Sequence, residues 1–288
     1  IVAGGTPYGS EIDAFNITTG GNATRFGELL LAVYAPAAFS SRTRGIIGGG
    51  KASPQGTQNT IQYVALPSEG NAVDFGDLQK TIVHTQGCSN QLIGTVMGNY
   101  AADNVIDYVI IATEGDAIDF GDLLRPRHTG TAAASKIHGF CVAGNTPSKV
   151  ASIDRITFVS PSNAIDFGDL TTIRWSTPAG ASNDVHGIFT YGRNDAGTFL
   201  NTIDKVTLST YGSAVEFGEM STVGVQVSGA TASTIRVTPM GGFTAPSNAV
   251  SNTISSVLIS STGGSEDFGD LTHHAAYHYA TSDCHGGL

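Results

Sequence analysis

The stretch N-A-I-D-F-G-D-L at residues 163–170 decides the fold, because five near-copies of it run through the rest of the chain. The copies, each called the phrase, are N-A-T-R-F-G-E-L (22–29), N-A-V-D-F-G-D-L (71–78), D-A-I-D-F-G-D-L (116–123), S-A-V-E-F-G-E-M (213–220) and G-S-E-D-F-G-D-L (264–271). Their phenylalanines, Phe26, Phe75, Phe120, Phe167, Phe217 and Phe268, stand 49, 45, 47, 50 and 51 residues apart. Such a period indicates one supersecondary unit stacked on its copies, since a single unit cannot bury its own apolar faces.

Each repeat contains material for four short strands. Before the phrase comes an alternating stretch such as I-D-R-I-T-F from Ile153, which predicts a half-buried strand. Before that lies an apolar run ending in small residues, such as I-I-G-G-G from Ile46, whose glycines allow close backbone approach near an axis. We expect a further strand after each phrase, for example over residues 171–177 and 272–280.

The two ends of the chain match neighbouring parts of one repeat. The last residues, S-D-C-H-G-G-L (282–288), match the turn S-R-T-R-G-I-I (41–47), and the first residues, I-V-A-G-G, match the strand that this turn leads into. The prediction is therefore an all-β, six-bladed β-propeller with four-stranded antiparallel blades, one domain over residues 1–288, closed by the C-terminal strand joining the N-terminal blade. A linear solenoid is the competing interpretation, but it would need atypical capping repeats at its ends.

Composition excludes several classes of function. A formal net charge of −10 argues against a nucleic-acid-binding surface, which needs a basic stripe. No apolar run reaches membrane-spanning length, so membrane insertion is not expected. Three cysteines at different places in their repeats do not form a disulfide framework and suggest reduced thiols.

The acids around Phe-Gly in each phrase are the most conspicuous polar feature. Six acidic pairs would suit calcium binding or acid–base catalysis, but a catalytic site needs one special place and this feature is spread around a ring. Arg25 also replaces the first acid in one copy. We therefore interpret the phrase as a turn and core anchor in which Asp accepts backbone N–H groups and Gly supplies an unusual dihedral. The anchors are the six phenylalanines above with Asp77, Asp122, Asp169 and Asp270.

The histidines near the C-terminus suggest zinc at first sight. His273, His274, His278 and His285 lie close to Cys284, and these are zinc-ligand types. In a strand, however, His274 and His278 would be about 13 Å apart, too far for one ion. We expect no metal site and no cofactor.

A second basic feature recurs in the repeats. The residue before the glycine that opens the second strand is Arg44, Ile93, His138, His186, Arg236 or His285. Equivalent positions in a propeller form a ring, so these side chains would gather positive or switchable charge on one face. The alternative is that they bind neighbouring turn carbonyls or blade acids.

The segments between the glycine-rich strand and the alternating strand vary most. They cover residues 6–11, 51–59, 100–104, 145–151, 193–201 and 243–251. Variable loops on one face of a rigid scaffold are the usual place for recognition, so a binding site is expected there.

The order of these motifs resembles a known repeat. It resembles the kelch repeat, which has a double glycine, then a strand with a tyrosine, then an aromatic residue after Asn. Tyr63 and Tyr108 stand where kelch has its tyrosine, and the phrase's Phe stands where kelch has Trp. The whole consensus, including the C-terminal S-D-C-H-G-G-L, is similar to a family of kelch-like repeat proteins associated with virion structural or tail-associated proteins of large tailed phages, notably those of cyanobacteria.

This resemblance implies a non-enzymatic virion structural or host-interaction module, made in the host cytoplasm and located in the virion. Its expected partners are other virion proteins, a second copy of the chain, and a host-surface glycan or protein. Two alternatives remain: a carbohydrate-binding propeller with equivalent pockets between blades, and a hydrolase with its site in the central channel. No catalytic constellation stands out to support the hydrolase.

Overall fold

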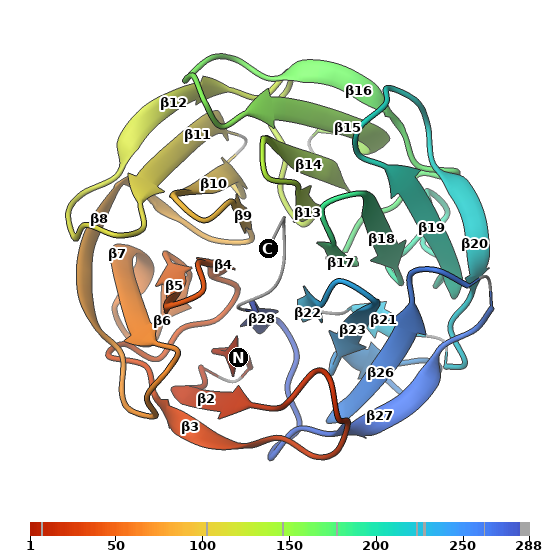
Figure 1. Cartoon of the computed structure of the whole chain (residues 1–288), viewed down its shortest axis with the longest axis horizontal. Coiled ribbons are helices and arrows are strands. Elements are labelled where there is room, and N and C mark those ends of the chain that lie inside the picture. The colour runs from red at the N-terminus through yellow and green to blue at the C-terminus, as the bar shows by residue number, and fades with distance from the viewer. Residues whose placement is uncertain are drawn as a thin grey trace.

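The computed structural model describes the chain except residues 7, 102, 146, 177, 223, 227–228, 262 and 283–288, and for residues 224–226 it describes the backbone alone. Six blades surround a central axis, each built on four antiparallel strands (Figure 1). The described residues contain no helix. The prediction of an all-β, six-bladed propeller is confirmed.

Five blades run from the axis to the rim in chain order, and the first blade takes its innermost strand, β28 (Tyr279–Ala280), from the end of the chain. The innermost strands are β4 (Ala37–Ser40), β9 (Gln86–Ser89), β13 (Thr131–Ala134), β17 (Ala179–Ser182), β22 (Gly229–Ala232) and β28 (Tyr279–Ala280). The second strands are β1 (Val2–Ala3), β5 (Arg44–Gly48), β10 (Ile93–Asn99), β14 (His138–Asn145), β18 (His186–Thr190) and β23 (Arg236–Met240).

The third and fourth strands complete the blades. The third strands are β2 (Glu11–Ala14), β7 (Gly56–Ala65), β11 (Asp103–Ile110), β15 (Lys149–Thr157), β19 (Thr202–Thr207) and β26 (Thr253–Leu258). The outermost strands are β3 (Thr24–Glu28), β8 (Val73–Ile82), β12 (Ile118–Asp122), β16 (Ile165–Asp169), β20 (Val215–Glu219) and β27 (Glu266–Asp270). Four short strands lie outside this scheme: β6 (Lys51–Ala52), β21 (Gly224–Gln226), β24 (Phe243–Thr244) and β25 (Ala249–Val250).

The C-terminal strand closes the ring inside the first blade, as predicted. β28 pairs antiparallel with β1, placing Val2 opposite Ala280 and Ala3 opposite Tyr279. The N-terminal amino group of Ile1 also donates to the carbonyl of Thr281 at 2.8 Å. The strand is shorter than the predicted 272–280, because residues 272–278 are irregular and pass across the ring toward the axis.

The phrase is the outermost strand, so its prediction as a turn was wrong, and the strand predicted over 171–177 lies later, at Ala179–Ser182. In the fourth blade, Ser152 lies opposite Asp169 and Ile153 opposite Gly168, but Asp154 lies opposite Asp166. Phe167 is therefore the extra residue of a β-bulge, which turns its ring into the core while pairing continues on both sides. All six phrase phenylalanines are buried, with at most 9% of their surface exposed.

Consecutive phrases bind one another and form a hoop around the rim (Figure 1). At the junction of the fourth and fifth blades, Gly212 N–H donates to the carbonyl of Phe167 at 3.2 Å, and Ala214 N–H donates to that of Asp169 at 2.7 Å. Backbone bonds of the same kind join the other neighbouring phrases, including Ala23 N–H to the carbonyl of Asp270, where the last phrase meets the first.

The first residue of the phrase strengthens four of these junctions with an Asn or Asp side chain. Its oxygen accepts the backbone N–H of the second acid in the preceding phrase at 3.0–3.1 Å, as Asn71, Asp116, Asn163 and Asn22 do for Glu28, Asp77, Asp122 and Asp270. Ser213 does the same for Asp169 at 3.2 Å. At these junctions the second acid thus acts through its backbone N–H and carbonyl rather than through its carboxylate.

The phrase glycine permits the close contact between blades. A Cβ on Gly168 would lie 2.6 Å from the carbonyl oxygen of Gly212, and Gly168 has φ +151°. All six phrase glycines face a neighbouring backbone in this way, with the hypothetical Cβ no more than 2.6 Å from a backbone atom. A side chain at this position would push two blades apart.

The polar residue of the third strand is buried, contrary to the half-buried strand predicted. Asp154 and Asp204 expose 1% and 0% of their surface, because neighbouring blades cover both faces of the strand. Each accepts a backbone N–H from the segment after the preceding phrase: Leu124 for Asp154 at 3.0 Å and Thr171 for Asp204 at 3.1 Å. Fully buried arginines from the same segments add ion pairs, Arg127–Asp154 at 2.6 Å and Arg174–Asp204 at 3.3 Å.

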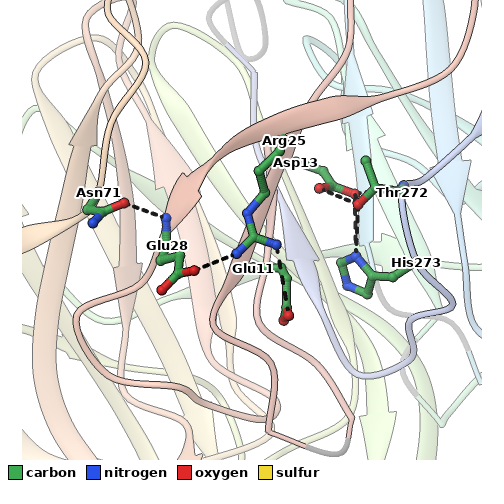
Figure 2. A network of polar contacts seen from close by, with 7 residues as sticks. All are labelled: Glu11, Asp13, Arg25, Glu28, Asn71, Thr272 and His273. Atoms are coloured by element: carbon green, nitrogen blue, oxygen red, sulfur yellow. Dashed lines mark hydrogen bonds and ion pairs between the residues drawn. The ribbon is translucent and has the colours of Figure 1, made fainter.

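The closing junction uses a different cation for the same purpose (Figure 2). Buried Asp13 accepts the backbone N–H of Thr272 at 2.9 Å and its hydroxyl at 2.8 Å, while His273 Nδ1 lies 3.5 Å from the carboxylate. On the same blade Arg25, where other phrases have an acid, pairs with Glu28 at 2.9 Å and lies 3.9 Å from Glu11.

Replacing Gly168 with alanine should destabilise the ring more than replacing Gly212. Both glycines have nearly the same φ, +151° and +149°, but a Cβ on Gly212 meets nothing within 4 Å. Gly212→Ala should therefore cost about 1 kcal/mol for the backbone conformation alone. Gly168→Ala should cost about 1–3 kcal/mol more for the clash. Urea unfolding would measure both, and equal losses would contradict the close-contact role of the phrase glycine.

The contact of His273 with Asp13, here called the closing latch, should weaken at alkaline pH. The hydrogen bond to Asp13 raises the pKa of His273 above its usual 6.5. The stabilisation is therefore fully present below about pH 6.5 and is lost as the pH rises through the raised value. His273→Gln should lower Tm near pH 6 and have little effect near pH 9, with a difference below about 1 kcal/mol for this partly exposed pair. A Tm loss that is constant with pH would show that the imidazolium charge is not used.

Candidate recognition face

The predicted variable loops lie together on one side of the ring, here called the loop face. A glycine with positive φ precedes each loop: Gly50, for example, has φ +93°, and a Cβ on it would lie 3.0 Å from the carbonyl oxygen of Tyr34. The segment leading to each innermost strand can therefore bridge to the loop, as in Tyr34↔Lys51, His128↔Asn145 and Trp175↔Arg193. Strands β7 and β15 begin earlier than predicted and take up part of these loops.

A backbone collar surrounds the axis on the loop face. Ala35, His84, Thr129, Ser176 and Tyr277 stand shortly before the innermost strands of five blades and have positive φ, between 52° and 69°. Ala35 N–H donates to the carbonyl of Tyr277, His84 N–H to that of Ala35, and Thr129 N–H to that of His84, at 2.9–3.1 Å. Left-handed backbone costs a residue with a side chain about 1–2 kcal/mol, and such strain gathers at ligand-binding places.

Seven rings form a continuous aromatic cluster over this collar. The cluster consists of Tyr8, Tyr34, His84, Tyr100, His128, Phe243 and Tyr277, and its successive ring centroids lie 4.7–6.2 Å apart. Tyr34 Oη lies 3.2 Å from His84 Nε2. Tyr8 and Tyr100 expose 40% and 61% of their surface, and the other five rings are half-buried. Sequence reasoning missed this cluster, because each of its positions is aromatic in only some blades and gives no periodic signal: His84 and Tyr277 share the collar position with Ala35, Thr129 and Ser176.

The cluster is electrically neutral near pH 7. Burial, with the charge of Lys51 and the neighbouring His128, lowers the pKa of His84 to about 4. Burial also lowers the pKa of His128. Burial raises the pKa values of the Tyr34 and Tyr277 phenols. The surface therefore offers aromatic faces and neutral hydrogen-bonding groups.

The central channel is narrow. The innermost strands carry small side chains, such as Ala38, Ala133, Gly180 and Ala230, which line a cavity of about 50 Å3. This volume has room for one or two water molecules, each of which takes ~30 Å3 in the liquid. Serines bind the innermost strands together, as in Ser89 Oγ to the carbonyl of Ser40 and Ser182 Oγ to that of Ala134, both at 2.7 Å.

The predicted basic ring lies at the opposite ends of the second strands, away from the loops. Arg44, His138, His186 and Arg236 each begin a second strand and pair with the end of a third strand. Their side chains are half-buried. Arg44 lies 4.5 Å over the Tyr63 ring and donates to the carbonyl of Ile111 at 3.0 Å. Arg236 lies 5.3 Å over Phe268.

The two histidines of this ring are also withdrawn from solvent. Burial lowers the pKa values of His138 and His186. The fifth predicted member, His285, lies outside the described residues, as does Cys284. The contacts of Arg44 with the carbonyl of Ile111 and, at 3.6 Å, with Glu114 are those of the alternative interpretation, in which these residues bind turn carbonyls or blade acids.

The C-terminal histidines separate in space and in role. His273 lies at the Asp13 latch, His274 is exposed, and His278 is fully buried next to the collar residue Tyr277. Among the residues that the structure describes, neither ring nitrogen of His278 has a hydrogen-bond partner, and burial lowers its pKa to about 3. Across the described ranges, no group of three or more His, Cys, Asp and Glu side chains is arranged to hold a metal ion.

A larger hollow of about 540 Å3 lies beside the first blade and is lined by Phe15, Phe26 and Leu66 among others. It borders Ser282, after which the chain lies outside the described residues, so its lining is incomplete. We assign no site to it.

No protein-family model and no curated protein matches this chain. In the described part of the chain, no helix is long and apolar enough to cross a membrane.

Acid should destabilise the protein through His278. Its lowered pKa means that the unfolded chain binds a proton that the folded chain does not, so stability falls as the pH drops from about 6.5 toward about 3. His278→Leu should flatten this part of the pH–stability curve measured by urea unfolding. His274→Leu, a change at an exposed neighbour, should leave it unchanged. An unaltered acid slope in His278→Leu would contradict a neutral buried imidazole.

Proposed function

We propose that this chain is a non-enzymatic binding module that recognises its partner with the loop face. The aromatic cluster carries the proposal, because seven rings from five blades converge on that face and leave Tyr8 and Tyr100 exposed. Aromatic side chains contribute most to the binding energy of recognition surfaces, since they bury a large area with few rotatable bonds.

The scaffold supports this proposal by keeping the cluster rigid. The hoop of phrases at the rim and the serine contacts at the axis hold each blade at both edges. A rigid platform loses little conformational entropy when it binds, which favours affinity.

The proposed setting is the virion of a tailed phage, as a structural or host-interaction component. This assignment rests on the resemblance of the phrase and the glycine motifs to kelch-like proteins of large tailed phages. Partners of the loop face would be other virion proteins, a second copy of the chain, or a host-surface protein or glycan. The net charge of −10 is consistent with a partner other than nucleic acid.

Photo-crosslinking on purified particles would test both parts of this proposal. A benzoylphenylalanine at Tyr100 should cross-link the chain to a partner on density-purified phage particles. The same group at Tyr211, an equally exposed tyrosine (59%) on the side opposite the loops, serves as the matched control. Absence of the chain from the particles, or cross-links from Tyr211 alone, would refute the proposal.

A further inference from the structure

The aromatic cluster has the chemistry of a site for a ligand with apolar faces and polar edges. Its rings are tilted to one another, for example by 52° between Tyr34 and Tyr277 and by 57° between Tyr100 and His128. The surface is therefore not one flat stacking plane but several ring faces at different angles. Phenol hydroxyl groups and imidazole nitrogens lie between those faces, and Tyr34 Oη and His84 Nε2 are already 3.2 Å apart.

Polar atoms at the base of the cluster have no partner within the described structure. These are Nδ1 of His84, Nδ1 of His128 and Oγ1 of Thr129. A buried polar atom without a hydrogen bond costs about 1–3 kcal/mol, and because these atoms are covered by the protein, an ordered water beneath the rings would satisfy them. The three atoms belong to collar residues or their direct neighbour, and thus lie close to the axis.

The charge of the cluster selects against ionic ligands. Its imidazoles are held neutral by burial, and phenols carry no charge at neutral pH. Lys51 and Arg193 lie at its border: the charge of Lys51 disfavours protonation of His84, and that of Arg193 acts on Tyr277. Arg193 is occupied by the Phe199 ring, 4.2 Å from its guanidinium. A neutral ligand fits the centre of this surface.

The backbone of the collar does not offer an edge to a peptide. A bound peptide strand would need free N–H and C=O groups, as in strand addition to a sheet. The N–H groups of Ala35, His84 and Thr129 already donate to neighbouring collar residues. Recognition must therefore come from side chains, as it does when a sugar ring stacks its C–H face on an aromatic ring and hydrogen-bonds through its hydroxyl groups.

We propose that the aromatic cluster binds a neutral oligosaccharide at the axis of the loop face. Tyr8 and Tyr100 provide the exposed stacking faces, and their hydroxyl groups, together with the His128 imidazole, hydrogen-bond to sugar hydroxyl groups. This inference rests on the proposed function and names the ligand class of the same face. It places one glycan site over the axis, rather than equivalent pockets between blades.

Binding of neutral oligosaccharides to the full chain tests the inference. The probes are cellohexaose, maltohexaose, chitohexaose and mannohexaose, with oligogalacturonate as the charged comparison. Trp175 is the only tryptophan and lies on the loop face, where its indole N–H donates to the carbonyl of Asn194 at 2.9 Å. Its fluorescence therefore reports on binding at this face, and isothermal titration calorimetry gives Kd.

At least one neutral oligosaccharide should bind, and Tyr100→Ala should weaken it about tenfold, which corresponds to about 1.4 kcal/mol. Tyr211→Ala should leave Kd unchanged. Tm is measured for both variants, because Tyr100 packs on His84 and His128 and Tyr211 packs on Arg155 and Phe167. His128→Gln should also weaken binding. If it lowers Tm, the Tyr100 and Tyr211 variants alone decide the result.

Three results would overturn the inference: no neutral probe binds, oligogalacturonate binds more tightly than every neutral probe, or Tyr100→Ala binds as well as wild type. Failure here can be told apart from failure of the proposed function. If position Tyr100 cross-links to a partner on phage particles but no sugar binds, the glycan proposal is refuted and the loop face remains the proposed recognition surface.

Discussion

Hydrogen bonding between consecutive phrases is the interaction on which the whole ring depends. The carbonyls of each phrase accept backbone N–H groups from the start of the next phrase, and the last phrase binds the first in this way through Asp270 and Ala23. The contact requires a glycine, because a Cβ would enter the neighbouring backbone. It also explains why the second acid tolerates Glu28 and Glu219: at this position the chain uses the peptide group, while the side chain faces solvent or lies at the surface.

A polar residue buried between blades also needs hydrogen-bond or ion-pair partners, and the junctions supply these partners in different ways. Asp154 and Asp204 have buried arginines, Asp13 has Thr272 and His273, and Gln62 exchanges two hydrogen bonds with the backbone of Leu31. Asp107 has no such cation in the described structure, and burial raises its pKa. An uncharged amide serves as well as a carboxylate, so the feature that these junctions share is the acceptor for the backbone N–H.

Sequence reasoning predicted the blade number and the closure because both follow from counting copies and matching ends. It misplaced the phrase as a turn, since a bulge at Phe167 looks like an interruption in a pattern of period two. It also took Asp154 as solvent-facing, because alternation does not show whether a second sheet covers the polar face. The aromatic cluster could not be predicted, because Tyr8, Tyr100 and Phe243 come from different blades. They join one cluster, through Tyr34, His128 and Tyr277, only after the ring has closed.

The small side chains of the innermost strands have a consequence for the geometry of the ring as a whole. Each blade is a wedge, and the alanines, glycines and serines at its tip, such as Ala133, Gly180 and Ser182, set how near the tips can approach. Bulkier tips would enlarge the circle, and the phrase contacts at the circumference would then no longer span the gap to the next blade. The size of the innermost side chains and the contacts between phrases therefore favour the same number of blades. A wider central channel could be obtained only by adding a repeat.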